Sequence, residues 1–149
     1  MRRVVITGVG GVTAFGSSWP EIRACLRAGR NAVRYMTEWD SLTDLNTRLA
    51  APIDEFKPPA HWTRKQLRSM GRVSQLAVRA SELALADAGF TGDPSIKDGR
   101  MGVACGSSFG SAPDIRNFVE MLQTGKSGGL NANSYVRMMP HTAAANIGI

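Results

Sequence analysis

The sequence has few of the residues from which disulfide scaffolds and metal sites are built. Its 149 residues include only two cysteines, Cys25 and Cys105, and two histidines, His61 and His141. The cysteines form no CxxC pair, and neither has a histidine at the spacing of a metal ligand. We therefore predict neither a disulfide framework nor a metal site.

Long apolar runs are also missing. No uncharged apolar stretch approaches the ~20 residues that a membrane-spanning helix needs. The start of the chain, Arg2-Arg3 followed by VVITGVGGVTAFG, imitates a signal peptide, but its glycines weaken any membrane-inserting helix. With 43% hydrophobic and 20% charged residues, the composition is that of a folded domain. We predict a cytoplasmic protein without membrane contact.

Acidic residues are absent from one part of the chain. No Asp or Glu lies between Phe56 and Ser81, and this segment holds six basic residues, which equals the net charge of +6. Aromatic residues are scarce at 7%, and only Trp62 lies among these basic residues, so base stacking and nucleic-acid binding are not predicted. The net charge is therefore a local feature. The six residues, called the basic segment below, are Lys57, Arg64, Lys65, Arg68, Arg72 and Arg79.

Helical signals occur at four places. Ser18 and Glu21 have the spacing of a capping box, and so do Thr63 and Gln66. Apolar residues at helical spacing predict the strongest helix over Val73–Ala88, with Gly89 as its cap. A further helix is expected from Ser111 to Gly125.

Two apolar segments are typical of buried strands. Val4–Val12 is β-branched and rich in glycine, and Met101–Cys105 is short, apolar and uncharged. Residues 48–53 predict an edge strand interrupted by proline. Strands that alternate with helices in this way predict an α/β fold with a mainly parallel sheet covered on both faces.

The end of the sequence is apolar. From Met138 it resembles the start of a helix, and it stops without a cap or a polar tail. We therefore expect an incomplete domain, with the remainder after Ile149.

Two motifs suggest other activities. Gly8-Val9-Gly10 follows a predicted strand, but Thr13 stands where a dinucleotide-binding loop needs its third glycine. Residues 106–110 match the GxSxG pattern of a serine hydrolase, with Ser108 as nucleophile. Such an enzyme would need His141 as base and Asp114 or Glu120 as acid, and this alternative stays open.

Several segments together resemble the N-terminal part of β-ketoacyl-acyl carrier protein synthases. They are RRVVITGVGGVTAFG, residues 63–70, the helix ending ALADAG, and MGVACGSSFG. The resemblance runs in order over nearly all of the chain and is nearest to the type II condensing enzyme of bacterial fatty-acid synthesis. It implies a thiolase-like α/β fold, with residues 1–149 in the first half of a five-layered αβαβα architecture that is usually paired as a homodimer.

The resemblance implies decarboxylative condensation of a cysteine-bound acyl chain with malonyl-acyl carrier protein, without a cofactor. In the family, the nucleophilic cysteine and two histidines lie beyond the position of Ile149. Cys25, Cys105, His61 and His141 do not match them, so no catalytic residue is assigned. We interpret the two cysteines as packing residues. The first alternative is a non-catalytic partner subunit of the chain-length-factor kind, which the residues of this chain do not distinguish from the synthase.

The resemblance also implies roles around the site. Three basic residues match the patch that docks the acidic carrier protein: Arg64, Lys65 and Arg68. Phe109 matches the residue that gates the acyl pocket, and Met138 and Met139 match the region that lines it. A second basic pair, frequent in type II members, is replaced here by residues 129–133, which carry no charge.

Overall fold

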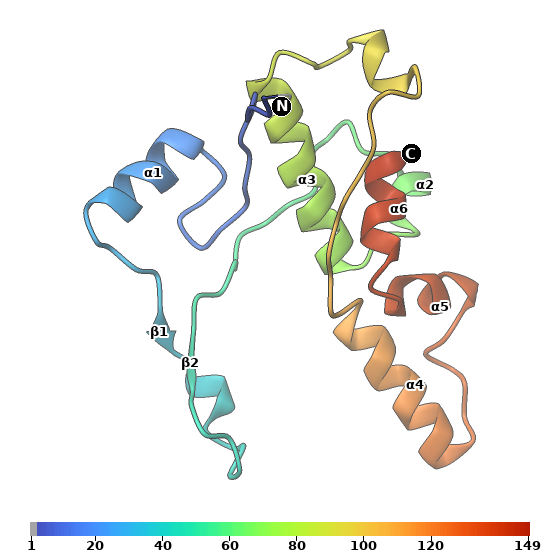
Figure 1. Cartoon of the computed structure of the whole chain (residues 1–149). Coiled ribbons are helices and arrows are strands. Elements are labelled where there is room, and N and C mark those ends of the chain that lie inside the picture. The colour runs from blue at the N-terminus through green and yellow to red at the C-terminus, as the bar shows by residue number, and fades with distance from the viewer. Residues whose placement is uncertain (1–2) are drawn as a thin grey trace.

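The computed structural model describes residues 3–149 and consists mainly of helices joined by long segments (Figure 1). The elements in chain order are α1 (Trp19–Arg27), β1 (Arg34–Tyr35), the 3-10 helix η1 (Thr37–Trp39), β2 (Leu49–Ala50), α2 (Arg64–Leu67), α3 (Arg72–Asp87), the 3-10 helix η2 (Pro94–Lys97), α4 (Ala112–Thr124), α5 (Ala132–Met138) and α6 (Thr142–Gly148).

The longest helix, α3, is the one that apolar periodicity predicts. It has 16 residues, and Gly89 follows it with a φ of 76°, a backbone conformation that favours glycine. Helix α6 packs along α3 (Figure 1). Few apolar side chains of the described residues are buried, and they are Ile22, Met36, Trp62, Met70 and Ala143.

The two predicted capping boxes have different outcomes. At Thr63 the box is present, because the Thr63 side chain and the Gln66 side chain each accept the other residue's backbone N–H. At Ser18 the prediction is wrong, since Ser18 precedes α1 but its side chain makes no capping hydrogen bond. Helix α4 ends at Thr124, one residue before the predicted end, and Gly125 caps it with a left-handed φ of 70°.

The predicted strands Val4–Val12 and Met101–Cys105 are not paired. Among residues 3–149 the only two-stranded pairing joins β1 and β2, which run antiparallel with Arg34 opposite Ala50. Val4 is 93% exposed, and Cys105 is also exposed, so the interpretation of Cys105 as a core residue is wrong for this structure. A strand needs a neighbour to complete its hydrogen bonds. Composition indicates a preference for a sheet, but it does not supply that neighbour.

The glycines near the N-terminus serve a close backbone contact. A Cβ atom on Gly10 would lie 2.4 Å from the Ala80 carbonyl oxygen of α3, and one on Gly8 would lie 2.3 Å from that of Ala84. Between them, the Val9 backbone N–H donates to the Asp87 carboxylate at 2.8 Å. Positions 8 and 10 therefore need small residues because the segment crosses α3 closely there, which accounts for Gly8 and Gly10 without a nucleotide.

Candidate functional site

The short helix α2 presents basic residues to solvent. Its first turn is fixed by the Thr63 capping box, in which the Gln66 N–H donates to Thr63 Oγ1 at 3.3 Å and the Thr63 N–H donates to Gln66 Oε1 at 2.9 Å. Arg64 and Arg68 are four positions apart and so share one face, with Lys65 beside them. All three side chains are exposed.

The basic segment divides into bound and free charges. The Arg72 guanidinium donates to the carbonyl oxygens of Ile53 and Phe56, at 2.5 and 3.3 Å, and lies 5.4 Å from the centre of the Phe56 ring. Arg79 forms an ion pair with Glu82 at 2.9 Å. These two cations therefore make contacts within the protein and are not free to bind a partner. The free members are Lys57, Arg64, Lys65 and Arg68, whose side chains have no hydrogen bond or ion pair within residues 3–149.

Glu82 is the first acidic residue after the basic segment, and it contacts three residues within the span of that segment. Its carboxylate accepts hydrogen bonds from Trp62 Nε1 at 2.6 Å and from Arg79, and it lies 2.9 Å from His61 Nε2. Burial acts to raise the pKa of Glu82, but the hydrogen bonds of His61, Trp62 and Arg79 outweigh it and lower the pKa. Glu82 thus ties α3 to the segment before α2, a role that the sequence alone did not suggest.

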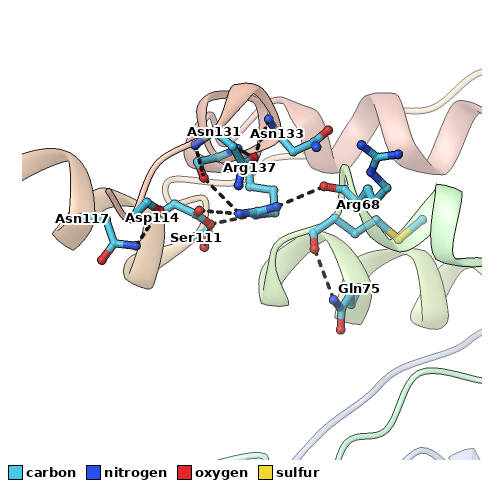
Figure 2. Close-up of polar contacts among 11 residues, drawn as sticks. Arg68, Gln75, Ser111, Asp114, Asn117, Asn131, Asn133 and Arg137 are labelled. Carbon is cyan, nitrogen blue, oxygen red and sulfur yellow. Dashed lines mark hydrogen bonds and ion pairs between the residues drawn. The ribbon is translucent and has the colours of Figure 1, made fainter. Parts of the chain in front are cut away.

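A second polar cluster joins α4, α5 and the end of α2 (Figure 2). The Arg137 guanidinium binds both oxygens of the Asp114 carboxylate, at 2.9 and 2.5 Å, and donates to Ser134 Oγ at 3.2 Å. Ser111 Oγ also donates to Asp114. Asp114 is only 5% exposed. The hydrogen bonds from Arg137 lower the pKa of Asp114 to about 2, against the opposing effect of burial, with further help from Ser111 and Ser134.

The three predicted acyl-pocket residues lie around one contact between chain segments. Phe109 is exposed, and the next residue, Gly110, packs so closely that its Cβ position would lie 2.1 Å from the Met138 carbonyl oxygen. The Ser111 N–H donates to the Arg137 carbonyl at 2.9 Å. Met138 is the last residue of α5 and Met139 follows it, both partly buried. The structure therefore brings the turn at Phe109 against the end of α5.

The structure does not assemble the hydrolase alternative. Within residues 3–149, Ser108 and His141 have no hydrogen bond between their side chains, and both residues are exposed. Asp114, one of the two candidate acids, is bound by Arg137 instead. Ser108 therefore has no activating base in this arrangement.

Other chemistry has little support in the described part of the chain. No group of three or more His, Cys, Asp or Glu side chains there could hold a metal ion. Cys25 is partly buried and Cys105 is exposed, and neither is in a disulfide. No helix among these residues is long and apolar enough to span a membrane.

Comparison with known proteins identifies the family. The sequence model described as "Beta-ketoacyl synthase, N-terminal domain" matches residues 1–149. The chain belongs to the β-ketoacyl synthase family. A solved β-ketoacyl synthase from Burkholderia phymatum STM815 is 65% identical to it, with a TM-score of 0.90, over 99% of this chain and 36% of that one.

Two further relatives show the breadth of the family. The structure titled "The ishigamide ketosynthase/chain length factor" is 29% identical, with a TM-score of 0.71, and the match covers 98% of this chain and 36% of that one. The 3-oxoacyl-[acyl-carrier-protein] synthase 2 of Coxiella burnetii (strain RSA 493 / Nine Mile phase I) is 32% identical over 125 residues, 83% of this chain and 30% of that protein. The chain spans about a third of the length of these relatives.

These findings confirm both the family resemblance and the thiolase-like α/β fold class predicted from the sequence.

Proposed function

We propose that this chain forms part of a β-ketoacyl-acyl carrier protein synthase of type II, acting in the chain elongation of fatty-acid synthesis. The family match over residues 1–149 is the observation that carries the proposal. A relative named 3-oxoacyl-[acyl-carrier-protein] synthase 2 supports the assignment to type II.

The proposed reaction has two stages. An acyl group passes from its carrier thioester to a cysteine thiolate of the enzyme, with the carrier thiol as leaving group. Malonyl-carrier protein then loses carbon dioxide, the resulting carbanion attacks the acyl-enzyme carbonyl, and the cysteine thiolate leaves. The cysteine and the two histidines that activate the malonyl thioester are expected outside residues 1–149.

The residues of this chain would act around that centre. We propose that Arg64, Lys65 and Arg68 dock the acidic carrier protein, because their charges are exposed and unpaired within the described residues, whereas Arg72 and Arg79 are bound internally. Phe109, Met138 and Met139 would border the acyl pocket, since their segments meet at one point. A homodimer and a cytoplasmic location complete the proposal.

The alternative is a non-catalytic subunit that sets chain length. The likeness to the ishigamide ketosynthase/chain length factor supports this alternative, since that protein is named for both kinds of subunit. Both alternatives have the same fold and the same proposed docking helix. They differ in whether the protein is acylated and catalyses condensation.

The deciding experiment supplies the complete purified protein with acyl-carrier protein and malonyl-carrier protein. A synthase becomes acylated on one cysteine and releases one carbon dioxide for each 3-oxoacyl product. If the protein binds carrier protein but is neither acylated nor active, the non-catalytic subunit is the correct assignment.

A further inference from the structure

Three successive backbone carbonyls at the end of α2 are each bound by a side chain from a different helix. The Arg68 carbonyl accepts from Arg137 Nη1 of α5 at 3.2 Å, and the Ser69 carbonyl accepts from an Asn146 side chain of α6 at 3.5 Å. The Met70 carbonyl accepts from the Gln75 side chain of α3 at 3.2 Å. Carbonyls at a helix end have no partner inside the helix, so these side chains replace water there. The exposed basic residues thus project from an anchored backbone.

Arg137 differs from the other two donors because it is itself held in an ion pair. Asp114 fixes its guanidinium from one side, and the Arg68 carbonyl lies on the other (Figure 2). The same figure shows the Arg68 guanidinium pointing away from the ion pair. Arg137 therefore binds the backbone carbonyl of Arg68, and the charged guanidinium of Arg68 stays free.

The backbone of Arg137 reaches the turn that carries Phe109. Its carbonyl accepts the Ser111 N–H at 2.9 Å, next to the close contact between Gly110 and Met138. Ser111 in turn lies against Gly71, whose Cβ position would be 2.9 Å from the Ser111 Cβ. One residue thus contacts the end of α2 through its side chain and the Phe109 turn through its main chain.

We propose that Arg137 is a positioning residue that sets the carrier-docking helix α2 against the turn at Phe109. A carrier protein bound at Arg64, Lys65 and Arg68 would then present its acyl thioester at a fixed place relative to that turn. The Arg137 side chain is only 23% exposed, so it would act through Arg68 and would not itself bind the carrier. This inference rests on the proposed function.

Arg137→Lys is the most informative variant. A lysine ammonium can still pair with Asp114, but it lacks the planar fork that lets arginine bind both carboxylate oxygens and the Arg68 carbonyl together. Arg116→Lys, an identical substitution on α4, is the matched control, because Arg116 is exposed and its side chain has no hydrogen bond within the described residues. If Arg137→Lys does not fold, Asp114→Glu is the second variant, since it keeps the charges and displaces the guanidinium.

The test measures steady-state kinetics of the complete protein with two acyl donors, acyl-carrier protein and the same acyl group on N-acetylcysteamine. Arg137→Lys should raise KM for the carrier-bound donor by about three- to tenfold, as expected for the loss of one hydrogen bond of ordinary net strength. Values of kcat, and KM for the carrier-free donor, should stay within about twofold. Equal losses with both donors, or an unchanged KM for the carrier, would overturn the inference.

A parallel variant separates this inference from the proposed docking surface. Lys65→Glu with Arg68→Glu removes the docking charges and leaves Arg137 in place. If that double variant uses acyl-carrier protein normally, the docking proposal fails, and the inference fails with it. If it is impaired while Arg137→Lys is not, only the positioning role is wrong.

Discussion

Arg137 binds both carboxylate oxygens of Asp114 across 23 positions of sequence, and this pair joins α5 to α4. The side chain of Asp114 is 8% exposed, so water screens the pair weakly. Removal of one partner leaves the other charge buried and uncompensated. The pair is therefore a structural contact on which the position of neighbouring segments depends.

The stability that this pair provides should depend on pH. Because the pKa of Asp114 falls from 3.8 to about 2 on folding, the carboxylate stabilises the protein above pH 3.8 and loses this effect as the pH falls toward 2. Asp114→Asn should lower the free energy of unfolding by about 2 kcal/mol at pH 7. The measurement is urea unfolding of the complete protein at several pH values.

The difference between wild type and Asp114→Asn should shrink between pH 4 and pH 2, following the lowered pKa. Asp44→Asn is the control, since Asp44 is exposed and has no side-chain hydrogen bond within the described residues. A difference that stays constant over this pH range would show that the Asp114 charge is not what stabilises the cluster.

The capping box at Thr63 should contribute more to the stability of the protein than Ser18, the residue before α1. Thr63→Ala removes a hydrogen bond to the Gln66 N–H and should cost about 1 kcal/mol. Ser18→Ala is the matched control, because the Ser18 side chain caps nothing. Hydrogen exchange at the Gln66 amide measures the effect directly. Equal exchange rates in wild type and Thr63→Ala would contradict the role of the box.

Much of the helical structure could be predicted because its signals are local. Apolar spacing predicts α3, and the pair Thr63 and Gln66 predicts α2. The strand segments could not be confirmed in the same way, since a strand depends on hydrogen bonds to distant residues. Val4–Val12 has the composition of a buried strand, yet the described residues provide it with no strand partner.

The sequence predicts the basic docking residues of the candidate site but not the ion pair beside them. Counting charges located the basic segment, and the family resemblance singled out Arg64, Lys65 and Arg68 within it; all three are exposed, as a docking role requires. Asp114 was considered only as a catalytic acid, and its partner Arg137 was missed because no local spacing links the two. The available signal was an arginine beside the apolar residues Met138 and Met139, where a charge needs a partner.

The close contact of the N-terminal segment with α3 can be tested with two adjacent glycines. Gly10→Ala places a Cβ 2.4 Å from the Ala80 carbonyl oxygen and should destabilise the complete protein by about 2 kcal/mol or more. Gly11→Ala is the control, because its Cβ would meet only the Thr13 side chain, at 4.0 Å. Thermal unfolding compares them. Equal melting temperatures would contradict the contact.

The contact behind Phe109 gives a similar pair. A Cβ on Gly110 would lie 2.1 Å from the Met138 carbonyl oxygen, whereas one on Gly106 would meet nothing within 4 Å. Gly110→Ala should therefore separate the Phe109 turn from α5 and lower both stability and acylation rate, and Gly106→Ala should be the milder change. A Gly110→Ala protein with wild-type melting temperature and acylation rate would argue against a pocket at this point.

Docking of an acyl carrier protein by the free charges of α2 can be measured by titration of carrier protein into the complete protein at low ionic strength. Arg23→Glu with Arg30→Glu reverses two exposed charges elsewhere and serves as the control. Lys65→Glu with Arg68→Glu should weaken binding by about tenfold or more, with the largest loss at low salt, while the control binds normally. Unchanged affinity of the Lys65 and Arg68 variant at low ionic strength would rule out carrier docking at these charges.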